Sequence, residues 1–252
     1  MRMDFSEFTT SSFKKFCQEL PQPGEIWEVS RVARSPLQFS TQEQQNLYSK
    51  SARRFLGEDS TPRYVMIVKE PEPAVEQQNK WQVISVMLLS VETSFLSDVD
   101  LLIPSHLSGV GQDLLAETWH VLPMLACNLS RLIGQRLSRK VYDLLLTVGD
   151  HYHGLVDEAP LLAQIQLLGL EMGITSAKQQ PEIQAFHQQE EAWSDVLIVP
   201  VAAYRTYIKT MKLTNAILDE ALQLAVLQKL VEDKKTARLD FRLKQDKKTQ
   251  EC

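Results

Sequence analysis

The chain has 252 residues, 44% of them hydrophobic and 23% charged, so it is long and apolar enough to bury a sizeable core. Its formal net charge is −5 at pH 7 and is shared between the two halves, which argues against tight nonspecific binding to nucleic acid. Three cysteines, Cys17, Cys127 and Cys252, lie far apart in the sequence, which argues against a disulfide framework or a zinc pattern.

The N-terminal residues predict a helix rather than a targeting signal, because they lack the apolar core of a secretory signal. In residues 4–20, Phe5, Phe8, Phe13 and Phe16 lie near one face of an amphipathic helix. The prolines and glycine that follow it would end this helix. No apolar run reaches the ~18 residues of a membrane span. We therefore expect a soluble, cytoplasmic protein with no membrane partner.

Short strands dominate the middle of the chain. Runs rich in β-branched and apolar residues predict strands at 25–33, 63–70, 81–92, 99–104 and 114–124. A long polar excursion separates the first two strands, and its residues 41–57 have helical spacing and a closing glycine. A helix over 138–149 follows, with Ser138 as its cap. Short strands closed by one helix are typical of a small β-barrel.

The chain after Gly154 reads as mainly helical. Helices are predicted at 159–173, 181–193 and 214–235, and the third carries an apolar stripe. The apolar run 195–204 predicts an edge strand, because Pro200 cannot donate to a sheet. The charged tail that follows is expected to fray.

These elements define an α+β protein in three parts. An N-terminal helix would occupy residues 1–22, a barrel residues 23–150, and a mainly helical region with a charged tail residues 151–252.

Within residues 23–149, the order of several motifs resembles the PemK/MazF toxin group. The motifs are PGEIWEV, PRYVMIV, WQVISVMLLS, VDLLIP, AETWHV, LSRLIGQRLS and VYDLLLTV. The resemblance implies an SH3-like barrel with a C-terminal helix, commonly dimeric. It also implies cleavage of single-stranded RNA without a metal or other cofactor.

The resemblance places a catalytic arginine at Arg63, just before the second strand. A guanidinium can bind a phosphate through two hydrogen bonds and stabilise the charge of the transition state. An exposed structural arginine at a strand start would give the same sequence. The family's threonine corresponds to Leu89, which cannot donate a proton to a phosphate oxygen. Ser90 or Thr93 could replace it only in a shifted register.

His120 is the candidate general acid or base, since histidine is the side chain that titrates near neutral pH. A pair of Arg63 and His120 could support attack by a 2′-hydroxyl group. A lone histidine on a strand is also commonly a structural residue.

Basic residues of the first long loop could contact phosphate. They are Lys50, Arg53 and Arg54, together with Arg31 at the end of the first strand. A solvated helical face would give the same pattern.

Two further groups of residues could carry chemistry. His151 and His153 could share a face toward a metal, but no third ligand follows at a suitable spacing, so no metal site is predicted. The four tryptophans Trp27, Trp81, Trp119 and Trp193 could include a base-stacking platform, although large core residues are the ordinary alternative.

The sequence thus favours a non-catalytic or regulatory relative of the PemK/MazF group that binds a protein partner or itself, with RNA or DNA binding as an addition. The alternative is a metal-independent endoribonuclease built on Arg63, Ser90 and His120. An enzyme requires these three side chains to share one open groove. A binding protein would show that groove filled by the inserted loop or the C-terminal helices.

Overall fold

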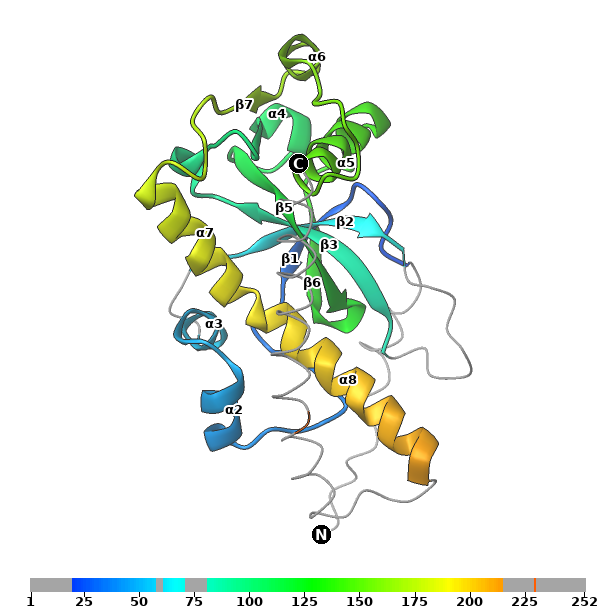
Figure 1. Ribbon diagram of the computed structural model, residues 1–252. Helices are drawn as coiled ribbons and strands as arrows, with labels where there is room; N and C mark the ends of the chain where they lie inside the picture. Colours follow the sequence, from blue (N-terminus) through cyan, green and yellow to red (C-terminus); the bar gives the residue numbers. More distant parts are fainter. Residues whose placement is uncertain (1–19, 58–60, 71–80, 215–228, 230–252) are drawn as a thin grey trace.

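The computed structural model describes residues 20–57, 61–70, 81–214 and Lys229 (Figure 1). The expected N-terminal helix, and the expected C-terminal helix beyond Thr214, therefore lie outside the described residues apart from their edges.

The described part is an α+β structure built on one seven-stranded sheet. Its strands are β1 (Ile26–Val29), β2 (Tyr64–Lys69), β3 (Val83–Ser90), β4 (Leu101–Ile103), β5 (Leu114–Leu125), β6 (Leu129–Ile133) and β7 (Glu171–Met172). They lie in the order β6-β1-β2-β3-β5-β4-β7, and every neighbouring pair is antiparallel. The sheet is open, with β6 and β7 at its edges, so the predicted closed SH3-like barrel is not confirmed.

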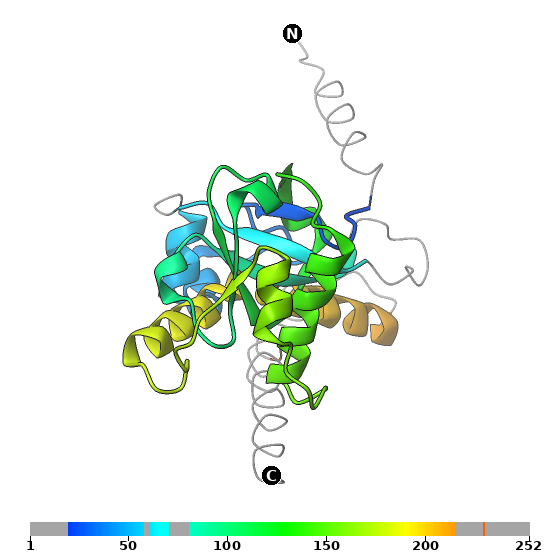
Figure 2. The same cartoon turned by 90° about the horizontal axis from the view of Figure 1, so that it is seen from above.

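Helices cover both faces of this sheet. They are α2 (Thr41–Leu47), α3 (Lys50–Leu56), α4 (Ser105–Ser108), α5 (Arg139–Tyr152), α6 (Leu162–Leu167), α7 (Pro181–Trp193) and α8 (Asp195–Thr214), with short 3₁₀ turns η1 (Thr93–Phe95) and η2 (Ala126–Asn128). Figures 1 and 2 show α7 and α8 running in line across one side of the sheet, while α5 lies on the other.

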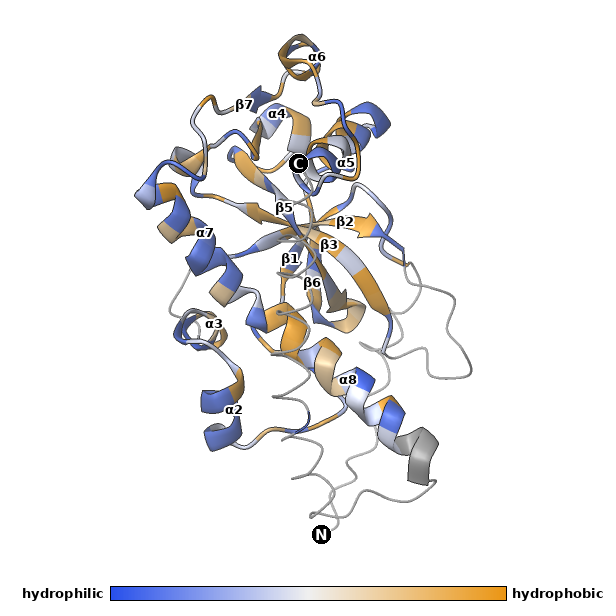
Figure 3. Cartoon of the chain, viewed as in Figure 1, coloured by the Kyte–Doolittle hydropathy of each residue, from blue (hydrophilic) through white to orange (hydrophobic). Residues whose placement is uncertain are grey.

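Side chains on the two faces of the sheet pack into two separate apolar clusters. Along β2, Val65 and Ile67 point to the α3, α7 and α8 side, whereas Met66 points to the α5 and α6 side. This alternation follows from the two-residue period of a strand. The central strands are consequently apolar on both faces, as their colour in Figure 3 shows.

The single helix expected over residues 41–57 is two helices. Ser49 interrupts it: its side chain caps α3 by accepting from the amide of Ala52 at 3.2 Å. Its own amide donates to Oδ2 of Asp195 at 2.8 Å, and its hydroxyl donates to the carbonyl of Ala192 at 2.5 Å. Through these two hydrogen bonds, Ser49 attaches the inserted segment to the junction of α7 and α8.

The strand predicted at 195–204 is wrong, because these residues form the first half of α8. Val196, Leu197, Val199, Val201 and Ala203 are all buried, so this half of the helix is apolar around most of its circumference. A short apolar run that is buried on all sides has no distinctive period, and so a strand and a buried helix cannot be told apart from it.

The region between α5 and α7 also departs from prediction. The helix expected over 159–173 is only α6, which ends before Gly169 in the left-handed region (φ 74°). The chain then adds β7 to the sheet beside β4. Strand β6, which pairs with β1, was not predicted. Elements after residue 150 thus share the sheet and core of the preceding ones.

Among the described helices, none combines the length and hydrophobicity that crossing a bilayer requires.

Candidate functional site: a buried polar network at a bulge

The most unusual stretch of the sheet is the middle of β5. Met87 pairs with Val121 and Leu89 pairs with Ala116, so a single residue of β3, Leu88, stands against residues 117–120 of β5. Such a bulge re-aims side chains and is frequent beside functional sites. Here it turns Glu117, Trp119 and His120 toward α7.

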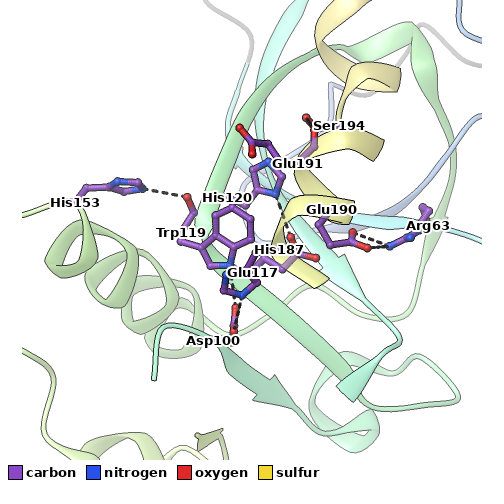
Figure 4. Close-up of polar contacts among 10 residues, drawn as sticks. All are labelled: Arg63, Asp100, Glu117, Trp119, His120, His153, His187, Glu190, Glu191 and Ser194. Carbon is purple, nitrogen blue, oxygen red and sulfur yellow. Dashed lines mark hydrogen bonds and ion pairs between the residues drawn. The ribbon is translucent and has the colours of Figure 1, made fainter. Parts of the chain in front are cut away.

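A buried ion pair joins α7 to the start of β2. Nη1 of Arg63 lies 2.7 Å from both carboxylate oxygens of Glu190 (Figure 4). The side chains of Arg63 and Glu190 are only 13% and 2% exposed. The guanidinium also lies over the ring of Trp193, 5.2 Å from its centroid. Arg63 is therefore held by α7 on two sides.

Glu117 connects this ion pair to His120. Burial raises the pKa of Glu117 well above its usual value, and the charges of Glu190 and Asp100 raise it further. Burial and these neighbouring charges therefore favour the protonated form of the carboxyl group. Its Oε1 meets no hydrogen-bond partner within the described ranges, and Glu190 lies near enough to raise the pKa of Glu117 further. Its Oε2 lies 3.1 Å from Nδ1 of His120.

His120 is neutral at neutral pH. Burial, followed by the charge of His187, lowers the pKa of His120 to about 3. Its ring is stacked on Trp119, with centroids 4.3 Å apart. A histidine with this pKa is a poor general acid near pH 7, because almost none of it is in the imidazolium form.

Asp100 forms the other end of the network. It is fully buried and accepts hydrogen bonds from the hydroxyl of Ser97 and from Nε1 of Trp119, the latter at 3.1 Å. Nε2 of His187 on α7 lies 3.4 Å from its Oδ2. These polar contacts therefore link the start of β2, β5, the segment before β4 and α7 in the buried interior.

The structure brings two of the three predicted catalytic residues into this network and leaves the third outside it. Arg63 and His120 are joined through Glu190 and Glu117. Ser90 is fully buried at the end of β3, where its hydroxyl accepts from the amide of Glu92 at 3.1 Å. Leu89 points to the opposite, α5 side of the sheet.

The predicted phosphate-binding residues divide between two places. Lys50 and Arg54 line a pocket of about 940 Å³ that also includes Arg63. Arg31 instead donates to the carbonyl of Phe55 at 3.2 Å, and Arg53 donates to the carbonyl of Gln45 at 3.4 Å.

This pocket is not purely basic. Glu92 and Glu182 line it beside the cations, and Phe95 and Phe186 form a stacked pair with centroids 4.6 Å apart. The pocket is therefore of mixed charge.

The histidine pair lies at the end of α5. Nε2 of His153 is 3.1 Å from the carbonyl of Trp119, and Nδ1 of His151 is 3.3 Å from the carbonyl of Val156. Within the described ranges, no group of three or more histidine, cysteine or acidic side chains could hold a metal ion.

Three of the tryptophans have structural surroundings. Trp193 is buried edge-on against Phe55, Trp119 is stacked with His120, and Nε1 of Trp27 donates to Glu25 at 3.0 Å. These contacts favour core and network roles over a base-stacking platform.

The sequence reasoning missed the four residues that give the network its character: Asp100, Glu117, His187 and Glu190. One signal was available for Glu117, because a carboxylate in an otherwise apolar strand must be paired, protonated or functional. Glu190 gave no such signal, since it stands in a polar helix among other acidic and amide residues.

The bulge depends on a close approach by α5. A Cβ atom on Gly149 would lie 2.4 Å from the carbonyl oxygen of Thr118, and both groups belong to packed elements. We expect Gly149→Ala to lower the free energy of unfolding by about 1–3 kcal/mol, because the clash outweighs alanine's better helix propensity. Urea unfolding followed by circular dichroism would measure it. Gly111→Ala, which meets nothing within 4 Å, is the control; equal stability of the two variants would contradict the expectation.

No protein-family model and no curated protein sequence matches the chain.

Proposed function

We propose that this protein is a non-catalytic relative of the PemK/MazF group that binds a protein partner. The observation that carries the proposal is the state of Arg63, the residue expected to hold a phosphate. Both carboxylate oxygens of Glu190 already occupy its Nη1 at 2.7 Å. A phosphate would have to displace this buried carboxylate to reach Nη1 of the guanidinium.

The surroundings of Arg63 support the same proposal. A ribonuclease needs its acid, base and phosphate-binding groups around one place that substrate can reach. Here His120 is 5% exposed and Ser90 is fully enclosed. Helix α7, from the region beyond the family resemblance, supplies the carboxylate that pairs with Arg63. That is the arrangement expected of a binding protein.

A protein partner is favoured over nucleic acid on two grounds. The net charge is −5, and the pocket that holds Lys50 and Arg54 also contains acidic side chains. Large apolar side chains are exposed on another part of the molecule, between residues 152 and 174. Exposed apolar surface of this kind is typical of protein interaction sites. The proposal also includes RNA or DNA binding as a second activity and a cytoplasmic location.

The proposal is tested with a long, fluorescently end-labelled single-stranded RNA, incubated without metal so that binding and cleavage are followed together. We expect the RNA to stay intact with the wild-type protein. Arg63→Ala and Arg63→Lys run alongside, the lysine variant because it keeps a cation beside Glu190. Circular dichroism confirms that each variant is folded.

Cleavage by the wild type that is lost in both folded variants would overturn the proposal in favour of the endoribonuclease. Binding without cleavage, weakened by Lys50→Ala and Arg54→Ala, would support a non-catalytic protein that also binds RNA.

A further inference from the structure

Exposed apolar side chains concentrate on one end of the molecule. Ten large hydrophobic residues are exposed in the described part, and seven of them lie between residues 152 and 174. The seven are Tyr152, Leu155, Val156, Leu161, Leu162, Leu167 and Ile174. Scattered single residues would need no explanation, whereas a concentration of this kind marks a surface that is covered by something.

Part of this surface is hollowed into a groove between α5 and α6, here called the α5–α6 groove. It encloses about 890 Å³, with Leu144, Val156, Leu161, Leu167 and Leu168 among its lining residues and Lys140 and Asp143 at its α5 side. Leu161 and Leu167 are 66% and 85% exposed. An apolar groove beside a helix, with charges along one side, suits the apolar face of an amphipathic helix.

The chain enters the described part beside this groove. The guanidinium of Arg136 donates to the carbonyl of Pro23 at 2.7 Å and to the side chain of Gln22 at 2.8 Å. The amide of Leu137 donates to the carbonyl of Gly24 at 2.9 Å. Residues 22–24 are thereby fastened just before the first turn of α5, and Lys140 in that turn lines the groove. Residues 1–19 must leave from this point.

The sequence of residues 1–19 contains an apolar helical face of the kind that could cover the groove. Phe5, Phe8, Phe13 and Phe16 fall near one helical face, and Leu20, which is 51% exposed, continues that face. Burying apolar surface is worth about 25 cal/mol per Å², so both the segment and the groove gain free energy by contact. A helix of this length spans roughly 25 Å, and its C-terminal end would lie within a few residues of the anchor beside the first turn of α5.

We propose that residues 4–19 dock as an amphipathic helix in the α5–α6 groove of the same chain. The short tether makes the contact intramolecular, with an effective concentration on the order of millimolar. The apolar stripe after residue 214 is a weaker candidate, because Figure 1 shows the end of α8 far from α5. The inference does not rest on the proposed function: the docked segment would cover the α5–α6 groove and leave Tyr152, Leu155 and Ile174, which do not line it, to a partner.

Disulfide trapping tests the proposal, because Cys17 lies at the edge of the phenylalanine face. Cys127→Ser and Cys252→Ser leave it as the sole cysteine, and a second is introduced by Leu161→Cys or Leu167→Cys in the groove. Arg139→Cys is the matched control: its side chain is 80% exposed and stands in the first turn of α5, but it does not line the groove. Disulfide formation is followed in a glutathione buffer at low protein concentration.

We expect at least one groove variant to form the intramolecular disulfide ten-fold or more faster than the Arg139→Cys control. Phe8→Ser with Phe13→Ser, which leaves Cys17 and the tether unchanged, should remove that advantage. Equal rates in the groove and control variants would overturn the proposal. Disulfide-linked dimers in place of the intramolecular product would also overturn it and would assign the groove to a second copy.

Discussion

Replacing Arg63 with alanine should lower the free energy of unfolding by about 3–5 kcal/mol, because it leaves a buried carboxylate without its counter-charge. Glu190 is 2% exposed and lies close enough to Glu117 to share a hydrogen bond. Asp100 adds a further acidic group to this interior. Urea unfolding followed by circular dichroism would measure the loss. Asp143→Ala, which removes an exposed ion pair with Arg139, should cost less than about 1 kcal/mol.

A double variant separates the ion pair from the packing around it. Arg63→Met combined with Glu190→Leu removes both charges and keeps most of the apolar volume, so it should regain much of the stability that Arg63→Ala loses. If Arg63→Ala costs no more than Asp143→Ala, the pair is not the buried constraint that we infer.

The stability of the protein should depend on pH in two opposite ways, through Glu117 and His120. The pKa of Glu117 is raised by burial and by the charges of Glu190 and Asp100. The stabilisation from its proton is therefore complete below pH about 4.5, and it is lost as the pH rises through the raised pKa. The pKa of His120 is lowered to about 3 by burial and His187, so its contribution is lost as the pH falls from about 6.5 to 3.

The two slopes nearly cancel where they overlap. Each group contributes at most about 1.4 kcal/mol per pH unit. Between pH about 4.5 and 6.5 they act in opposite directions, and outside that range only one of them acts. We therefore expect a plateau of stability there, with a decline on the acid side from His120 and on the alkaline side from Glu117.

Glu117→Gln tests the alkaline side. Glutamine has nearly the same shape and cannot ionise, so the free energy of unfolding of this variant, relative to that of the wild type, should rise as the pH rises above about 4.5. Urea unfolding at fixed pH values would show it. Glu182→Gln, an exposed carboxyl on the same helix as Glu190, should keep the wild-type slope. An unchanged slope in Glu117→Gln would mean that Glu117 is already ionised in the folded protein.

Local signals in the sequence predicted much of the secondary structure. The strands around Trp27, Val65 and Val86 and the helix capped by Ser138 all form, because alternation, turn residues and a capping hydroxyl act within a few residues. Helix α7 also begins at Pro181 as expected. The apolar run before Pro200 did not reveal its structure, since burial on all sides removes the period that distinguishes helix from strand.

Some residues of the candidate site could likewise be recognised from the sequence, whereas others could be found only in the folded structure. Sequence reasoning singled out Arg63 and His120, because an arginine before a strand and a histidine within one are recognisable residue types. It could not see that Glu190, 127 positions further on, binds Arg63. Nor could it see that burial deprives His120 of its charge. Both facts depend on which distant side chains share a low-dielectric space.

By itself, the sequence determined the elements with a clear period and the identity of two network residues, since those properties are local. Only the tertiary structure decided that the sheet stays open, that β5 bulges against Leu88, and that α7 closes over Arg63. Each of these depends on contacts between segments far apart in the chain. Their free energies come from burial and charge pairing, which no single segment contains.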